Sequence, residues 1–204
     1  MNDRQIFGTG VAIVAAGAVL AYLVWPQPAP APRLEGDGPG PNLEIEVAGA
    51  TEGEIVIDLL PAAAPAHVAR IVDLTRQGRY NGVVFHRVIP EFMAQTGDVE
   101  FGQVGTDLSQ AGMGGSDLPD LVAEFSDVPF DQGIVGMARS ASPDSANSQF
   151  FITTAPALHL NGQYTVVGRV LSGFEVVLAL KAGDPNANGA VEDPDYIASA
   201  RIAE

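Results

Sequence analysis

One stretch decides the fold, and it reads Val83-Val84-Phe85-His86-Arg87-Val88-Ile89-Pro90-Glu91-Phe92-Met93-Ala94-Gln95-Thr96-Gly97-Asp98. β-Branched and aromatic residues fill two runs, 83–88 and 92–97, and proline lies only between them, so the pattern predicts a β-hairpin. Because side chains alternate along a strand, we expect Arg87 on the side of Phe85 and Met93 on the side of Gln95. A guanidinium beside apolar side chains and an amide makes this hairpin a candidate functional element.

Composition limits the classes of function. The 204 residues are enough for one domain with a core and an appendage. Asp and Glu number 25 against 10 Lys and Arg, and the formal net charge of -15 repels nucleic acid and anionic lipid headgroups. The chain has no cysteine, which excludes disulfides and thiol nucleophiles. The histidines, His67, His86 and His159, lack the spacing of zinc ligands.

The N-terminal part predicts a membrane anchor. Residues 6–25 contain no charged side chain, and at about 1.5 Å per helical residue they span a bilayer core of roughly 30 Å. A cleaved signal peptide is the alternative interpretation. Residues 26–41 are rich in proline, alanine and glycine and predict an extended spacer. Both interpretations place the following domain, residues 42–204, outside the cytoplasm.

Two helices are expected in this domain. The first covers residues 65–77, with Val68, Ile71 and Val72 facing inward and His67 solvated in the first turn. The second begins at Ser172, where Glu175 would complete a capping box, and ends at Gly183, with Phe174, Val177 and Leu178 facing inward.

Alternating and β-branched runs predict the strands. In addition to the hairpin of residues 83–97, the predicted strands cover residues 43–47, 54–59, 133–138, 148–152, 164–171 and 195–203. Residues 97–115 are predicted to form a loop. About eight short strands and two helices predict a mainly β fold. The expected architecture is a closed eight-stranded antiparallel barrel capped by the two helices.

Two motifs carry a resemblance to a known family. The stretch from Phe85 to Asp98 resembles the signature of cyclophilin-type peptidyl-prolyl isomerases. Met137-Ala138-Arg139-Ser140, followed by Ser145-Ala146-Asn147-Ser148-Gln149-Phe150-Phe151-Ile152, resembles the second signature in its bacterial form. The likeness covers residues 43–204. It implies an eight-stranded antiparallel barrel capped by two helices, in agreement with the strand count.

The resemblance implies a site and a reaction. Arg87 looks like the catalytic arginine, which would donate to the prolyl nitrogen of a twisted Xaa-Pro bond over an apolar pocket. No cofactor or metal is implied. The substrate-binding positions would be Phe92, Met93, Gln95, Ala138, Arg139, Gln149, Phe151, His159, Leu160 and Tyr164. The implied partners are proline-containing segments of exported proteins. The implied place is the periplasm, with the domain tethered to the bacterial inner membrane through residues 6–25 or soluble after signal cleavage.

This chain departs from the family pattern at the rim of the expected site. His159 stands where many eukaryotic members carry tryptophan, so we expect weak cyclosporin binding. Tyr164 replaces a common histidine, and Arg139 replaces a common asparagine. The loop of residues 141–144 is one residue longer than in many eukaryotic members, which would shift the preference for the residue before proline.

Other interpretations stay open beside this one. Residues 184–195 carry oxygen-bearing side chains at the spacing of an EF-hand calcium loop, although Pro194 hampers an exiting helix and an Asn-Gly turn explains the same residues. His86 reads as a packing and hydrogen-bonding residue, since isomerisation transfers no proton. A tethered module that binds proline segments without isomerising them is the alternative function.

Overall fold

The computed structural model describes residues 36–203 of the chain. The predicted anchor, residues 6–25, and most of the predicted spacer lie outside these residues. Within residues 36–203, no helix combines the length and the apolar character needed to cross a membrane.

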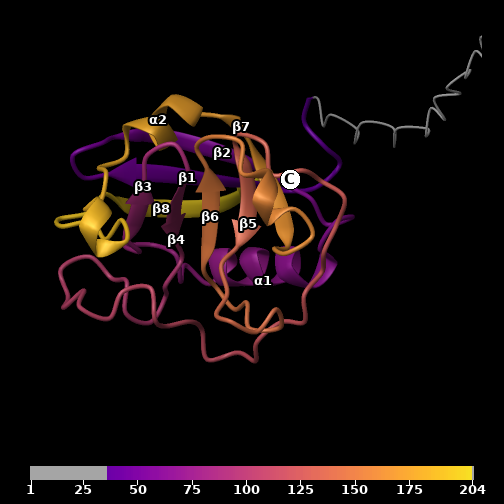
Figure 1. Cartoon of the computed structure of the whole chain (residues 1–204), viewed down its shortest axis with the longest axis horizontal. Coiled ribbons are helices and arrows are strands. Elements are labelled where there is room, and N and C mark those ends of the chain that lie inside the picture. Colours follow the sequence, from indigo (N-terminus) through magenta and orange to yellow (C-terminus); the bar gives the residue numbers. More distant parts are fainter. Residues whose placement is uncertain (1–35, 204) are drawn as a thin grey trace, which may run out of the picture. The chain divides into compact units, whose positions relative to one another are not determined.

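One antiparallel sheet of eight strands forms the body of the domain (Figure 1). Its strands lie in the order β3-β4-β6-β5-β7-β2-β1-β8. The mainly β class with eight antiparallel strands and two helices is therefore confirmed. The strands are β1 (Asn42–Ala48), β2 (Gly53–Leu59), β3 (Arg87–Ile89), β4 (Met93–Thr96), β5 (Ile134–Met137), β6 (Phe150–Thr153), β7 (Val166–Ser172) and β8 (Tyr196–Ala203).

The sheet curls, but the predicted closed barrel is confirmed only in part. No continuous ladder joins β3 to β8 in residues 36–203. The segment before β3 contacts β8 and the residue before it instead. Val84 forms an isolated bridge with Tyr196, and the Phe85 N–H donates to the Asp195 carbonyl at 2.8 Å. The pairing of β3 with β4 begins at Arg87. Phe85 packs in the interior, so the expectation that it shares a side with Arg87 is wrong.

The strands β5 and β6 are buried on both faces, which explains their nearly continuous hydrophobic sequences. Along β6, Phe150 and Ile152 face the main interior cluster, whereas Phe151 belongs to a second, smaller cluster on the other face. Met93 of β4 joins this second cluster, and Ala94 joins the first. The outer face of these strands is therefore an apolar floor, on which the site described below is built.

The helix α1 (Pro65–Arg76) forms as predicted and buries Val68, Ile71 and Val72. The prediction that His67 is solvated is wrong, because its side chain is fully buried. The His67 Nδ1 atom lies 2.7 Å from the Glu124 carboxylate, which also accepts the backbone N–H of His67 at 3.1 Å. A residue 57 positions away covers the first turn of the helix, and helix periodicity cannot reveal such a contact.

The helix α2 (Phe174–Ala179) is shorter than predicted and lacks the capping box. Ser172 remains in β7, where it pairs with Val56 of β2, so it is not available as a cap. The chain turns instead at Gly173, whose φ of 76° favours glycine. Leu178, expected to face inward, is exposed. Figure 1 shows α1 and α2 on opposite sides of the curled sheet.

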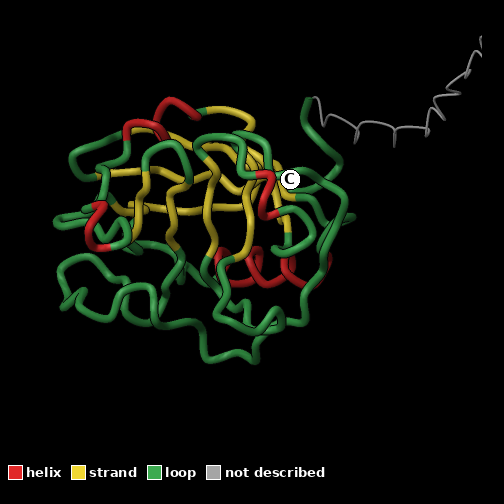
Figure 2. The backbone as a smooth tube through the Cα atoms, viewed as in Figure 1, coloured by secondary structure: helices red, strands yellow, loops and turns green. Residues whose placement is uncertain are grey.

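A long connection without helix or strand follows β4, as Figure 2 shows. It is organised by Asp98, a fully buried carboxylate. One of its oxygens accepts the backbone N–H groups of Glu100 and Phe101 at 3.0 and 2.9 Å. The other accepts those of Gly112 and Gly114 at 2.7 and 3.0 Å. One side chain thereby joins the beginning and the end of the predicted 97–115 loop.

Candidate active site

Strand register brings the central side chains of the site into one row. Arg87 of β3 lies directly opposite Gln95 of β4, and Gln95 lies opposite Phe151 of β6. Neighbouring strands are about 4.8 Å apart, so a guanidinium, an amide and an aromatic ring lie within two strand spacings of each other. Both signature motifs identified in the sequence contribute to this row.

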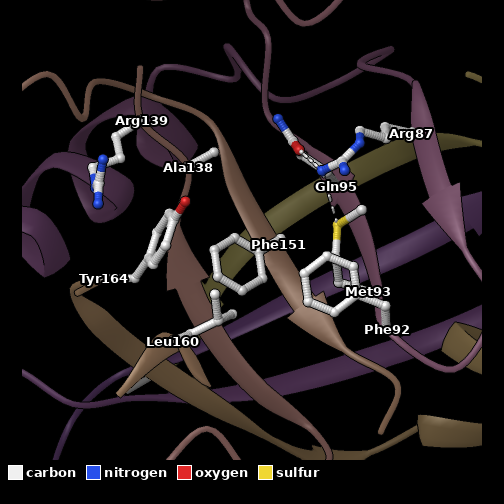
Figure 3. Close-up of a pocket in the computed structure, with 9 residues that line it drawn as sticks. All are labelled: Arg87, Phe92, Met93, Gln95, Ala138, Arg139, Phe151, Leu160 and Tyr164. Atoms are coloured by element: carbon white, nitrogen blue, oxygen red, sulfur yellow. Dashed lines mark hydrogen bonds between the residues drawn. The ribbon is translucent and has the colours of Figure 1, made fainter. Parts of the chain in front are cut away.

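These side chains line a pocket of about 110 Å³ (Figure 3). Its apolar part is made by Met93, Phe151 and Leu160, all buried, and by Phe92 at the edge. Such a volume accommodates a small ring. The full lining consists of Arg87, Phe92, Met93, Gln95, Ala138, Arg139, Phe151, Leu160 and Tyr164. No histidine, carboxylate or hydroxyl of serine or threonine is among these nine residues.

Arg87 is held by neutral acceptors. Its Nη1 donates to Gln95 Oε1 at 3.2 Å and lies 3.8 Å from the Met93 sulfur. On the other side, Nε donates to the Asn188 carbonyl at 2.9 Å and Nη2 to Asn188 Oδ1 at 3.1 Å. A guanidinium has five N–H groups. Three of them meet oxygen acceptors and a fourth meets the Met93 sulfur, a weak acceptor, so donor capacity remains for a ligand.

The charge of Arg87 is not compensated by a carboxylate within residues 36–203, since none forms an ion pair with it. Burial lowers the pKa of Arg87 from its usual value, and Tyr164 opposes this effect. Arginine begins from so high a value that it stays protonated at neutral pH. The pocket therefore holds a permanent and accessible cation.

A chain of amides continues from Arg87 away from the pocket. Gln95 Nε2 donates to Gln149 Oε1 at 2.9 Å, and Gln149 Nε2 donates to the Gly114 carbonyl at 2.8 Å. Every amide in this chain has both ends engaged, which fixes the orientation of the Gln95 oxygen toward Arg87. Gln149 is buried and lies behind Gln95, outside the pocket lining.

The opposite wall is an aromatic stack. The Arg139 guanidinium lies 4.4 Å from the centre of the Tyr164 ring, and Tyr164 meets the Phe151 ring edge-on at 5.7 Å. The Arg139 nitrogens donate to the carbonyls of Gln163, Ser140 and Ala141. Arg139 thus closes the wall beside Tyr164, whereas the Arg87 guanidinium lies on the opposite side of the pocket, beside Gln95 and Met93 (Figure 3).

Nine of the eleven site residues expected from the sequence line the pocket. The other two are Gln149, behind Gln95, and His159, which is exposed and whose ring lies 5.6 Å from that of Phe92. Sequence reasoning missed Asn188, the residue that makes two hydrogen bonds to Arg87. The sequence presents Asn188-Gly189 as a turn or as part of the calcium-loop pattern of residues 184–195, and neither interpretation connects the pair with Arg87.

The remaining candidates lie elsewhere. His86 is buried, as its predicted packing role requires. Asp195, the last position of the calcium-loop pattern, turns inward and accepts the N–H groups of Thr51 and Lys181 at 2.9 and 2.8 Å. Residues 36–203 contain no cluster of three metal-ligating side chains.

Comparison with known proteins identifies the family of this chain. The family model described as cyclophilin type peptidyl-prolyl cis-trans isomerase/CLD matches residues 42–202. A probable peptidyl-prolyl cis-trans isomerase of Brucella suis biovar 1 is 57% identical over 153 residues, covering 74% of this chain and 78% of the relative. A peptidyl-prolyl cis-trans isomerase-like 1 protein of Aspergillus niger is 38% identical over 156 residues, covering 74% and 90%.

Solved structures show the same fold. The cyclophilin AquaCyp293 from Hirschia baltica superposes with a TM-score of 0.66 at 27% identity, over 81% of this chain and 75% of that one. A cyclophilin from Cryptosporidium parvum gives a TM-score of 0.67 at 24% identity, over 80% and 99%. Residues 42–202, which the family model matches, include both signature motifs and every strand of the sheet except the last residue of β8. The chain belongs to the cyclophilin family of peptidyl-prolyl cis-trans isomerases and is an isomerase.

Proposed function

We propose that Arg87 accelerates the rotation of Xaa-Pro bonds by donating a hydrogen bond to the prolyl nitrogen. Resonance gives the Xaa-Pro bond a rotational barrier of about 20 kcal/mol. When the bond is perpendicular, the nitrogen becomes pyramidal and recovers its lone pair. A donor aimed at this lone pair binds the transition state better than it binds either planar isomer, which is the condition for catalysis.

The observation that carries this proposal is the accessible guanidinium beside an apolar floor. Met93, Phe151 and Leu160 can hold the proline ring, while Arg87, oriented by Gln95, keeps donors free on the pocket side. A cyclophilin from Cryptosporidium parvum was crystallised in the presence of the dipeptide Ala-Pro. We take proline-containing peptide segments as the substrate class of this chain as well.

The size of the effect follows from one hydrogen bond. A bond to a charged donor is worth about 1.5–3 kcal/mol, which corresponds to roughly 10- to 150-fold in rate. Greater acceleration requires the pocket, where exclusion of water disfavours the polar planar amide. No proton transfer, nucleophile or metal takes part in this mechanism.

The test is a protease-coupled assay of a proline peptide with the full chain and its Arg87→Ala variant. We expect kcat/KM to fall about 10- to 150-fold. The control is Arg79→Ala, which removes another arginine whose contact, with Asp117, lies on the exposed surface. Equal rates for wild type and Arg87→Ala would refute the mechanism. Retained peptide binding without any isomerase activity in the wild type would favour the binding-module alternative.

We also propose that the domain acts on exported proteins in the periplasm. Its support is the uncharged run of residues 6–25, followed by the proline-rich spacer of residues 26–41. Membrane fractionation of cells that express the full chain tests the tether. Deletion of residues 6–25 is expected to move the protein out of the membrane fraction, and an unchanged distribution would refute the tether.

A further inference from the structure

The segment that contains Asn188 covers the outer edge of β3, the end strand of the sheet. The Val88 N–H donates to the Gly189 carbonyl at 2.9 Å, and the Val88 carbonyl accepts the N–H of Gly183 at 2.9 Å. These bonds hold residues 183–189 against the strand that carries Arg87. The segment is therefore placed by backbone contacts that do not depend on the Asn188 side chain.

Asn188 adopts a backbone conformation that few residues tolerate. Its φ is 54°, in the left-handed region where asparagine, aspartate and glycine are favoured. This conformation aims both its carbonyl and its side-chain oxygen at one guanidinium, at 2.9 and 3.1 Å from Nε and Nη2. Among these three residue types, asparagine alone combines the conformation with an uncharged side-chain acceptor.

The two sides of the guanidinium are held differently. Asn188 engages Nε and Nη2, and Gln95 engages Nη1. Together they fix the plane of the guanidinium at two points, so the group cannot turn about its bonds without breaking a hydrogen bond. The acceptors are neutral on both sides, and the full positive charge remains directed at the pocket.

We propose that Asn188 is a positioning residue for Arg87. It orients the guanidinium so that the unused N–H donors point to the place of the prolyl nitrogen. This inference rests on the proposed role of Arg87. Asn188 is exposed, and the one hydrogen bond that its side chain makes within residues 36–203 is to Arg87. Its removal is therefore expected to affect activity more than stability.

The test uses Asn188→Gly, because glycine keeps the left-handed backbone and the carbonyl acceptor but removes the side-chain oxygen. We expect kcat to fall about tenfold, with KM within twofold and an unchanged thermal midpoint, since a small misalignment of a catalytic group is costly in rate. The matched control is Asn186→Ala. Asn186 lies in the same segment, and its side chain bonds Asp184 rather than Arg87.

A double-mutant cycle separates this inference from the mechanism on which it rests. If Asn188 acts through Arg87, the change to glycine has no further effect in the Arg87→Ala background. Wild-type activity of Asn188→Gly, or an equal loss in both backgrounds, would overturn the positioning role. Full activity of Arg87→Ala would instead refute the Arg87 mechanism.

Nitrogen NMR of the guanidinium gives a readout independent of residual activity. Rotation about the Nε–Cζ bond is expected to be faster in Asn188→Gly, and an unchanged rate would contradict the proposal.

Discussion

Acid should destabilise this protein through His86, the residue that precedes Arg87. The imidazole is buried against the 97–115 loop, where the Gly112 Cα is so near that an added Cβ would lie 2.9 Å from the ring. Burial lowers the pKa of His86 to about 4, although the Asp98 carboxylate acts in the opposite direction. His86 is thus neutral in the folded protein at pH 5, whereas in the unfolded chain, with a pKa near 6.5, it is largely protonated.

The size of this effect follows from the two proton affinities. Between pH 6.5 and pH 4 the unfolded state binds more protons than the folded state, so stability falls as the pH falls through this window. Each tenfold difference in proton affinity corresponds to about 1.4 kcal/mol, so the free energy of unfolding falls by about 3 kcal/mol in total across this window. The share lost between pH 7 and pH 5 is about 2 kcal/mol.

Denaturant unfolding of the wild type and of His86→Met, at about pH 7 and about pH 5, measures this loss of stability. Methionine fills a comparable volume, adapts to the contact with Gly112 and does not titrate. The wild type is expected to lose about 2 kcal/mol more than the variant between pH 7 and pH 5. Because every other acid and base is common to the two proteins, the comparison isolates His86. Equal losses in both proteins would refute the reasoning.

Two further predictions concern the pocket. In Gly136→Ala the new Cβ would lie 2.7 Å from both the Phe130 and the Phe151 rings, so these rings must shift, and Phe151 lines the pocket. We expect KM for a proline peptide to rise several-fold and unfolding free energy to fall by about 1–3 kcal/mol, and an unchanged KM would contradict this. The second prediction is that kcat/KM measured in buffers from about pH 6 to about pH 9 is flat, since Arg87 keeps its proton. A bell-shaped profile would indicate proton transfer instead.

The strands around the pocket could be predicted because the pattern of residue types along them is typical of β-strands. Proline at the turn and β-branched runs on both sides predicted the hairpin of β3 and β4, although β3 covers Arg87–Ile89 rather than residues 83–88. The alternation of Phe150 and Phe151 separated the interior from the pocket face. The two signature motifs contain seven of the nine pocket residues, and the family resemblance added Leu160 and Tyr164. These features depend on short-range patterns, which a single sequence contains in full.

The features that could not be predicted depend on distant partners. Asn188 reaches Arg87 across 101 positions, and no periodicity connects the two. His67 appeared solvated because its cover, Glu124, comes from another segment. Ser172 resembles a helix cap in the sequence, yet it belongs to β7 and pairs with Val56 of β2. In each case a tertiary contact overrides a correct local preference.

The carboxylate of Asp98 has a consequence for how the domain can be altered. It accepts backbone N–H groups of Glu100 and Phe101 at the beginning of the loop and of Gly112 and Gly114 at its end. These bonds hold Gly114 in place without any side chain of residues 105–111. We therefore expect sequence inserted between residues 105 and 111 to leave the Gly114 carbonyl, the last acceptor of the amide chain behind Arg87, in place. The enzyme therefore offers an attachment point for a second recognition domain beside an intact catalytic centre.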